Sequence, residues 1–308
     1  MLKALKKTVK RILAAIHKRR RVKELASTRP VVTKVDLVRD LKKMGVNTGD
    51  LLFVHSSLKS LGFVEGGPET VISALLEAVG EEGTVMLPTY YMPGGGILST
   101  CQIPDYEFDP RIHGSNMGAL PDAFLKFPKV HRSIHPTHSV SAIGKHAKYL
   151  TESHHLAPSV FGKGSPWERC WELNGKVFGL GISMGPVTFY HLLEDRIGDA
   201  FPLPVRMPNE FKMPCRDWNG SPVIVPVRAL DPQYQPQRID HKSRKDLRDY
   251  FFKEFEANGL LTAGKVCEAQ AWFIESKPFL EHLETLMKQG ITIYSCPADL
   301  AEHHINQA

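Results

Sequence analysis

The residues from Lys176 to Asp195 constrain the fold of this chain more than any other stretch. Lys176–Ile182 has the apolar run of a buried strand, and Ser183-Met-Gly-Pro186 has the composition of a turn. The turn predicts a helix that begins near Thr188. Strand–turn–helix units of this kind build α/β sheets, and open α/β sheets place their ligand sites where a strand end meets the start of a helix.

His191 and Glu194 lie three residues apart in the predicted helix and therefore share one face, with Asp195 one residue further round. The helix dipole disfavours a charged imidazole near the helix start, which leaves His191 able to accept a proton. A neighbouring carboxylate then stabilises the imidazolium once it has formed. The pattern therefore predicts a general base with its partner. The alternative is an ordinary surface pair at a helix start, because His-x-x-Glu is a short pattern.

The composition is typical of a globular protein with a large core. The chain has 308 residues, of which 42% are hydrophobic. Its five cysteines are scattered, with no Cys-x-x-Cys spacing, which favours reduced thiols in a cytoplasmic protein over a disulfide framework or a thiolate zinc site. No apolar run is long enough to span a bilayer.

Positive charge is concentrated at the N-terminus. Residues 1–28 contain ten Lys or Arg and one Glu, a balance of +9, whereas the whole chain carries +6. Residues 29–308 are therefore mildly acidic, which argues against a nucleic-acid partner. Apolar residues recur at helical spacing in this leader, so it suits peripheral contact with the inner face of an anionic membrane. A terminal helix packed on its own domain is the alternative.

The predicted domain covers residues 29–308 and begins with a helix capped by Thr33 that ends at Gly45. Leu51–His55 is a predicted buried strand. The segment from His55 to Pro68 then combines two serines at a strand end with a glycine pair before a helix, in which Pro68 takes the first position. Bare amide groups beside a helix start form an anion site, so a pyrophosphate could bind there. A glycine-rich connection without a ligand is equally compatible with the pattern.

The later part of the chain gives weaker signals. Ser165-Pro-Trp-Glu168 predicts a helix start with a capping box. Beyond residue 206, the sequence predicts a strand at Ser221–Val227, helices at Asp246–Asn258 and Ser276–Gln289, and a last short strand at Ile291–Ser295. The polar segment Arg238–Arg244 is either a solvated loop or a contact with substrate or CoA phosphates.

Several motifs in order along residues 33–200 resemble the aminoglycoside 3-N-acetyltransferase family. They are His55-Ser-Ser-Leu-x-x-Leu-Gly-x-Val-x-Gly-Gly, Gly83-Thr-Val-Met-Leu-Pro-Thr89, Phe108-Asp-Pro, Met117-Gly-Ala-Leu, Arg132-Ser-x-His-Pro-x-x-Ser139, Gly164-Ser-Pro and Thr188-x-x-His191-x-x-Glu194. The resemblance implies a three-layer α/β/α sandwich around a mixed sheet. It also implies transfer of an acetyl group from acetyl-CoA, without a metal, to an amine of an amino sugar.

The resemblance also implies roles for particular residues. His191 is the expected base and Glu194 its partner. The expected acetyl-CoA site comprises His55, Ser56, Ser57, Leu58, Gly66 and Gly67, with Arg132 and Ser139 close to the active site and assigned to the same group. The acceptor is either an aminoglycoside or a polysaccharide or lipopolysaccharide precursor, and the oligomeric state stays open. Transfer to another amine and a non-catalytic protein that binds CoA or a sugar are the alternative functions.

Seven histidines lie between residues 113 and 155, which raises the question of a metal site. His135-Pro-Thr-His138 has a ligand-like gap, but Pro136 and the lack of a third ligand at helical spacing disfavour it. The resemblance places His135 in a motif near the active site, whereas it gives His138 no role. The sequence therefore predicts no metal site.

Overall fold

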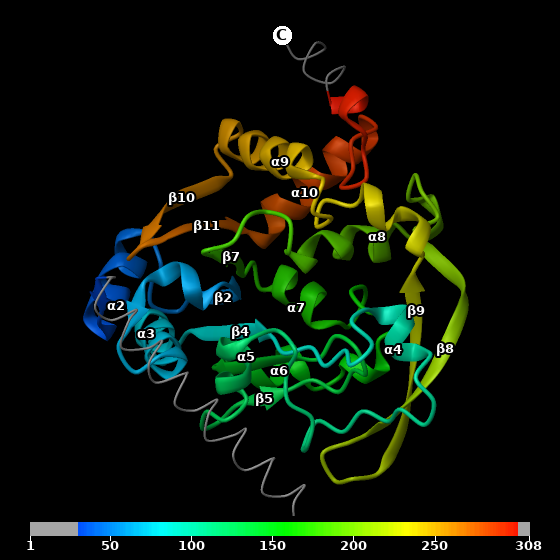
Figure 1. Ribbon diagram of the computed structural model, residues 1–308, viewed down its shortest axis with the longest axis horizontal. Helices are drawn as coiled ribbons and strands as arrows, with labels where there is room; N and C mark the ends of the chain where they lie inside the picture. The colour runs from blue at the N-terminus through cyan, green and yellow to red at the C-terminus, as the bar shows by residue number, and fades with distance from the viewer. Residues whose placement is uncertain (1–29, 301–308) are drawn as a thin grey trace, which may run out of the picture.

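The computed structural model describes residues 30–300, and a seven-stranded mixed sheet lies at its centre (Figure 1). The strand order is β10, β11, β7, β2, β4, β6 and β5. The strands are β10 (Leu261–Val266), β11 (Ala269–Glu275), β7 (Lys176–Leu180), β2 (Leu51–Ser56), β4 (Thr84–Pro88), β6 (Val140–Gly144) and β5 (His131–Arg132). The strand predicted from residue 176 is β7 and the strand predicted from residue 51 is β2, so both predictions are confirmed.

The three middle strands are parallel. β2 pairs with β4 on one side and with β7 on the other, while β11, β10, β6 and β5 join as antiparallel strands. Helix α3 (Pro68–Val79) carries the chain from β2 to β4, and β7 is added later on the opposite side of β2. The winding of the sheet thus changes direction at β2, and α/β sheets bind ligands beyond the strand ends at such a point.

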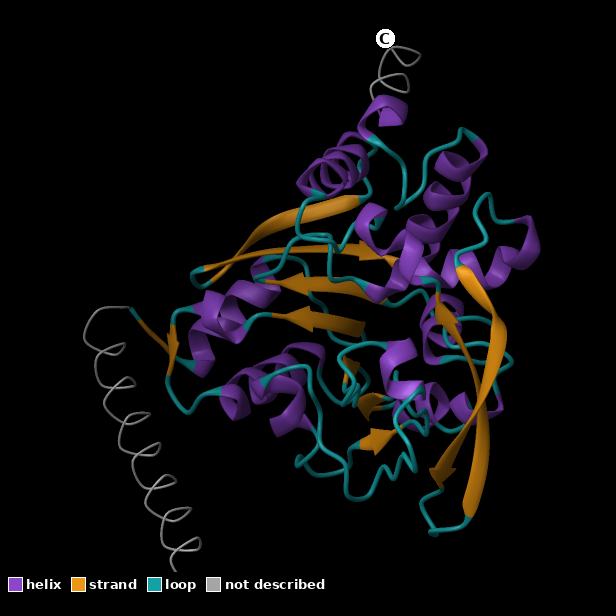
Figure 2. Ribbon diagram, turned by 45° about the vertical axis from the view of Figure 1, so that its right-hand side comes forward, coloured by secondary structure: helices purple, strands orange, loops and turns teal. Residues whose placement is uncertain are grey.

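Helices cover both faces of the sheet, which confirms the predicted three-layer sandwich (Figures 1 and 2). One face packs against α2 (Lys34–Lys43), α3 and α5 (Ala119–Phe124). The other face packs against α6 (Ala147–Thr151), α7 (Pro166–Glu172), α8 (His191–Ile197), α9 (Lys245–Ala257) and α10 (Ser276–Lys288).

Side chains along β2 alternate between these two layers, as the pleat of a strand requires. Leu51 and Phe53 belong to the core under α7 and α8, whereas Leu52 and Val54 belong to the core under α2 and α3. The next residue, His55, therefore points to the side of α8. Its ring lies 4.5 Å from that of Phe53.

The helix starts predicted near residues 33 and 68 are confirmed. Thr33 caps α2 in a reciprocal box with Asp36, and Pro68 is the first residue of α3. The predicted box at Ser165 forms only in part. The Ser165 hydroxyl accepts from the Glu168 amide, but the Glu168 carboxylate accepts from the amide of Gly164 and not from that of Ser165.

Strand predictions failed mainly in the last third of the chain. The ribbon of β8 (Arg206–Arg216) and β9 (Pro222–Leu230) runs along one side of the molecule, apart from the central sheet (Figures 1 and 2), and only its second strand was predicted. β10 and β11 were missed. The strand predicted at Ile291–Ser295 is wrong, because this segment turns and its one bond to a distant backbone runs from the Ile239 amide to the carbonyl of Ile293.

The basic leader, residues 1–28, lies outside the described residues. Its predicted contact with anionic membranes stays a prediction. Co-sedimentation of the full chain with anionic liposomes at low salt would support this contact, and its absence would contradict it. Within residues 30–300, no helix is long and apolar enough to cross a membrane.

Buried histidines form part of the core beside α7. His135 stacks on His154 at 4.4 Å between ring centroids, and His138 lies edge-on to His135. Their nitrogens bind protein groups: His135 Nδ1 accepts from the His138 amide, and His154 lies between the Ser133 hydroxyl and the carbonyl of Val160. In residues 30–300, no group of three or more His, Cys, Asp or Glu side chains is arranged so that it could hold a metal ion.

These histidines should make stability depend on pH. Burial lowers the pKa of His55 to about 4 and that of His154 to about 3, and it lowers the pKa of His135 and His138 well below the usual range. The unfolded chain, with histidine pKa near 6.5, therefore binds more protons below that pH. The free energy of unfolding should fall from pH 7 to pH 5, by about 1.4 kcal/mol per pH unit for each histidine charged only in the unfolded chain.

Urea unfolding at several pH values measures this dependence. His154→Gln should weaken it, whereas the exposed His131, replaced by Gln, should leave it unchanged. A free energy of unfolding that is constant between pH 7 and pH 5 would contradict the assignment of neutral buried histidines.

Candidate active site

The loop that leaves β7 brings the predicted helix to the switch point of the sheet. Gly181 has a φ of +73°, and a Cβ at this position would lie 2.6 Å from the Cβ of Ser60, so a glycine is required there. The chain then makes one 3₁₀ turn, Thr188–Tyr190, before α8 begins at His191. The predicted helix start near Thr188 is thus correct, with a tighter first turn than expected.

His191 and Glu194 make the contact that their spacing predicted. His191 Nδ1 lies 2.9 Å from Glu194 Oε1, and the Glu194 side chain is almost fully buried. The same oxygen accepts a hydrogen bond of 2.8 Å from the hydroxyl of Tyr294. Because a carboxylate only accepts, His191 Nδ1 carries the proton of this bond, and a neutral ring then has an unprotonated Nε2.

A second layer supports this carboxylate. Arg206, from β8, binds Asp195 at 2.6 Å and lies 3.5 Å from Glu194 Oε2, while Asp195 also accepts from the amide of Phe161. Burial by itself raises the pKa of Glu194, but the nearby His191 and Arg206 outweigh burial and lower this pKa overall. Glu194 therefore stays ionised, ready to stabilise a protonated His191.

Thr188 joins three other elements to the helix start. Its Oγ1 lies 2.8 Å from the Tyr90 hydroxyl, 3.1 Å from Trp167 Nε1, which donates, and 3.3 Å from His55 Nε2. The Thr188 amide also donates to His55 Nε2, so this nitrogen is unprotonated. The hydroxyl is fully used when it donates to His55 and accepts from Tyr90 and Trp167.

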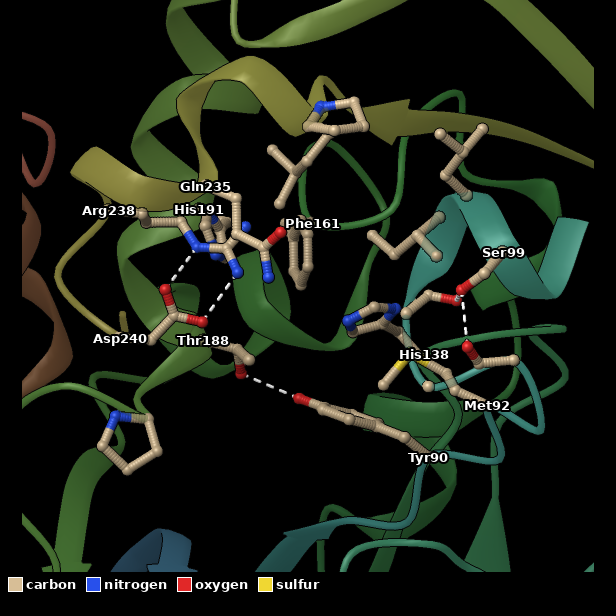
Figure 3. Close-up of a pocket in the computed structure, with 18 of the residues that line it drawn as sticks. Tyr90, Met92, Ser99, His138, Phe161, Thr188, His191, Gln235, Arg238 and Asp240 are labelled. Carbon is tan, nitrogen blue, oxygen red and sulfur yellow. Dashed lines mark hydrogen bonds and ion pairs between the residues drawn. The ribbon is translucent and has the colours of Figure 1, made fainter. Parts of the chain in front are cut away.

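A cavity of about 680 Å³ opens beside His191. Its wall includes Tyr90, Met92, the glycines 94–96, Ser99, His138, Phe161, residues 185–188, His191, Asp231, Gln235 and residues 238–240. Figure 3 shows His191, Gln235 and Arg238 on one side of this cavity, and Met92, Ser99 and His138 across from them. His191 Nε2 has no hydrogen-bond partner among residues 30–300, so it is available to a ligand. A cavity of this size suits a small molecule.

Sequence reasoning missed several residues of this site. Tyr90 lies two residues beyond the end of β4, and this position was a usable signal. His138 was interpreted as incidental and yet lies on the cavity wall. Burial lowers the pKa of His138 well below the usual range, so it is a neutral wall residue. Arg206 and Tyr294 are far from His191 in sequence and carried no signal. Arg238, Ile239 and Asp240 of the polar segment line the cavity. The predicted contact of this segment with substrate or CoA phosphates stays a prediction.

None of the residues predicted to bind acetyl-CoA lines the cavity. His55 is buried behind Thr188. Ser56, Ser57 and Leu58 lead from β2 into a 3₁₀ turn, where the Ser60 hydroxyl contacts both the Ser57 hydroxyl and the carbonyl of Gly181. This segment thus packs on the loop from β7 that supplies residues 185–188 to the cavity.

The glycine pair before α3 is only partly free for a ligand. Gly66 and Gly67 both have positive φ, as expected for a sharp turn into a helix. The Gly67 amide already donates to the carbonyl of Val64, so it is not available to a phosphate.

Arg132 and Ser139 hold loops together. The Arg132 guanidinium donates to the Ser139 hydroxyl and to carbonyls that include those of Thr89, His113 and Gly114, and its side chain is buried. The Ser139 hydroxyl donates to the Thr89 carbonyl. This geometry does not support their prediction as ligand-binding residues. Instead, they fix the backbone just before Tyr90.

Comparison with known proteins decides the family. The model of a family described as aminoglycoside 3-N-acetyltransferase matches residues 53–288, which include both the parallel strands and the His191–Glu194 pair. The chain belongs to the aminoglycoside 3-N-acetyltransferase family. It is therefore an N-acetyltransferase, as the resemblance of its motifs predicted.

Individual relatives agree with this assignment. Aminoglycoside N(3)-acetyltransferase III of Acinetobacter baumannii is 38% identical over 199 residues, which cover 61% of this chain and 68% of the relative. Among solved structures, aminoglycoside acetyltransferase AAC(3)-IIb superposes with a TM-score of 0.70 at 29% identity, over 85% of this chain and 98% of that one. AAC-VIa bound to sisomicin gives a TM-score of 0.67 at 25% identity, over 83% and 98%.

The Tyr294 hydroxyl should affect how activity depends on pH. Tyr294→Phe removes one hydrogen-bond donor from the buried Glu194 carboxylate, and this carboxylate therefore becomes more basic. As a result, the His191–Glu194 pair takes up its first proton at a higher pH. The acidic limb of kcat/KM should therefore move to higher pH, and the maximum should fall about 10-fold. Tyr149→Phe is the matched control, because Tyr149 bonds Glu172 at the surface. An unchanged acidic limb in Tyr294→Phe would contradict this role.

Proposed function

We propose that this protein transfers the acetyl group of acetyl-CoA to an amine of an amino sugar, with His191 as the general base. One observation carries the proposal: the ring of His191 lines a cavity, its Nε2 has no hydrogen-bond partner among residues 30–300, and its Nδ1 is held by the buried, ionised Glu194. A base needs this arrangement, because the proton it accepts creates a positive charge that the carboxylate stabilises.

The chemistry follows from the state of the acceptor. A sugar ammonium has no lone pair, so it cannot attack a thioester. His191 Nε2 removes one proton, and the neutral amine then forms a C–N bond to the acetyl carbonyl carbon as the C–S bond breaks. The electron pair of that bond leaves with the thiolate of CoA. The nitrogen, which is positively charged once the C–N bond has formed, loses a second proton to that thiolate, so the amide and the thiol of CoA result, and the proton held by His191 passes to solvent. Glu194 stabilises the imidazolium in between.

Some of the residues predicted to bind acetyl-CoA lie against the loop that leads to the cavity. Ser56, Ser57 and Leu58 pack on the loop from β7, and the same loop forms the cavity wall up to Thr188. We propose that the CoA tail lies along this contact, with the glycine pair 66–67 beside it. The family supports acetyl-CoA as the donor. When bound, acetyl-CoA would supply an activated thioester, whose carbonyl carbon the amine attacks.

The acceptor class rests on the relatives. The relative AAC-VIa was crystallised with the amino sugar sisomicin, which supports an amino sugar as the acceptor here. No comparison supports a polysaccharide or lipopolysaccharide precursor. A non-catalytic role would require neither the bare Nε2 nor the buried carboxylate, so the site favours an enzyme.

Thiol release tests the proposal directly. His191→Ala should lower kcat by at least about 10²-fold while binding of CoA and thermal stability persist, because the base acts on the acceptor and not on the tail of the donor. His131→Ala is the matched control at an exposed position. Release of CoA from acetyl-CoA, with a panel of amino sugars, gives the rate. Near-normal turnover by folded His191→Ala would refute the role of His191.

A further inference from the structure

Tyr90 lies on the wall of the cavity that His191 also lines, and its hydroxyl bonds to the side chain of Thr188 (Figure 3). The two oxygens are 2.8 Å apart, and on distance alone either could be the donor. Burial raises the pKa of Tyr90, so the phenol keeps its proton. The direction of this proton decides whether the hydroxyl offers a ligand a donor or an acceptor.

The other partners of Thr188 fix the direction of this bond. Trp167 Nε1 can only donate, and it gives its proton to Thr188 Oγ1 at 3.1 Å. His55 Nε2 accepts from the Thr188 amide at 3.4 Å, so this nitrogen carries no proton and cannot donate to Oγ1, which lies 3.3 Å away. The hydroxyl of Thr188 therefore has one proton for two neighbours, Tyr90 and His55.

One arrangement of protons satisfies all of these groups. If Thr188 donated to Tyr90, its Oγ1 and the buried His55 Nε2 would face each other as two acceptors at 3.3 Å, with no proton between them. If Thr188 donates to His55, both atoms are bonded, and Oγ1 accepts from Trp167 and Tyr90. The proton of Tyr90 is thus committed to Thr188. No group in residues 30–300 donates to the Tyr90 hydroxyl oxygen, so this oxygen remains an acceptor for a ligand.

Thr188 also holds the Tyr90 oxygen near the base. Thr188 and His191 are three residues apart across the 3₁₀ turn that precedes α8, and side chains at this spacing lie on one face. In the neutral ring, His191 Nε2 is unprotonated, because Nδ1 carries the proton of the bond to Glu194. The wall next to the helix start therefore offers two groups that accept hydrogen bonds, His191 Nε2 and the oxygen of Tyr90.

A primary ammonium group matches two such acceptors. It carries three N–H donors, so it can give one to His191 and another to Tyr90. His191 removes the first proton, and the bond to Tyr90 keeps the nitrogen in place when that proton has gone. The nitrogen is charged when it enters and again once the C–N bond has formed, so in both states the bond to the Tyr90 oxygen is a charge-assisted one.

We infer that Tyr90 binds the reacting nitrogen of the acceptor by accepting a hydrogen bond from it, and that Thr188 and His55 are positioning residues that fix the direction of the tyrosine proton. This inference rests on the proposed function and adds a second contact to the reacting amine. It applies to acceptors with one amine or with several, since it concerns only the nitrogen that reacts.

Tyr90→Phe tests this contact by release of CoA, with the fastest of sisomicin, kanamycin and glucosamine as the acceptor. The value of kcat/KM should fall at least about 10-fold, because a hydrogen bond to a charged nitrogen is lost. The acidic limb of its pH profile should stay in place, in contrast to Tyr294→Phe, since the His191–Glu194 pair is untouched. Tyr91→Phe is the matched control, because Tyr91 is not part of the cavity wall.

An unchanged kcat/KM in folded Tyr90→Phe would overturn the inference, and loss of activity in His191→Ala would show that the proposed function still holds. Failure of the unmodified protein to release CoA with all three acceptors would refute the proposed function as well. Affinity for CoA, measured by calorimetry, should be the same with and without the Tyr90 hydroxyl, because the contact is with the acceptor.

Variants of Thr188 test the direction of the proton. Thr188→Val removes the oxygen that takes the tyrosine proton and should lower kcat/KM about 10-fold, whereas Thr188→Ser keeps this oxygen and should stay within about 3-fold of the unmodified protein. The double variant of Tyr90→Phe and Thr188→Val should be no slower than the slower single variant. If the two effects multiply instead, Thr188 does not act through Tyr90, and its positioning role is wrong. Tyr90→Phe decides the contact itself even if Thr188→Val fails to fold.

Discussion

The hydrogen bonds of the buried Glu194 carboxylate connect the site to the rest of the fold. An ionised carboxylate removed from water requires compensation, and it is supplied here by His191 on the same helix, Tyr294 from the C-terminal segment and Arg206 from the β8–β9 ribbon. Helix α8, the β8–β9 ribbon and the C-terminal segment must therefore all be correctly placed before the base is in position. This explains why the ribbon and the C-terminal segment, which lie outside the central sheet, pack against α8.

The groups that surround Thr188 in this site are polar but uncharged. Thr188 and its partners Tyr90, Trp167 and His55 form a neutral network at the strand ends, since burial keeps the tyrosine protonated and lowers the pKa of His55 to about 4. The ion pair of Arg206 and Asp195 lies outside the cavity wall, whereas the ion pair of Arg238 and Asp240 is part of it.

The parts of the fold that could be predicted from sequence depend on local pattern. The cap at Thr33, the proline at the start of α3, the strand β7 and the pairing of His191 with Glu194 all follow from residues a few positions apart. Each of these features is contained in a short segment of the sequence, so it could be predicted without knowledge of the tertiary structure.

The errors have a common physical cause. Tyr294 and Arg206 reach Glu194 only through tertiary packing, and no local spacing connects them to it. The apolar run at Ile291–Ser295 is buried by packing against the loop at Ile239 and not by pairing in a sheet. The family resemblance assigned Arg132 to the acetyl-CoA site, but its guanidinium donates to the backbone carbonyls of Thr89 and Gly114, whose positions the sequence cannot locate.

The central claim is that His191 holds its proton on Nδ1 and presents a bare Nε2 to the acceptor. ¹⁵N NMR of the protein labelled at histidine, compared with His191→Gln to assign the signals, measures the tautomer of the neutral ring directly. The account predicts a protonated Nδ1 and an unprotonated Nε2, and a loss of this preference in Glu194→Ala. A neutral ring with its proton on Nε2 would contradict the account, because that nitrogen could not then accept a proton from the amine.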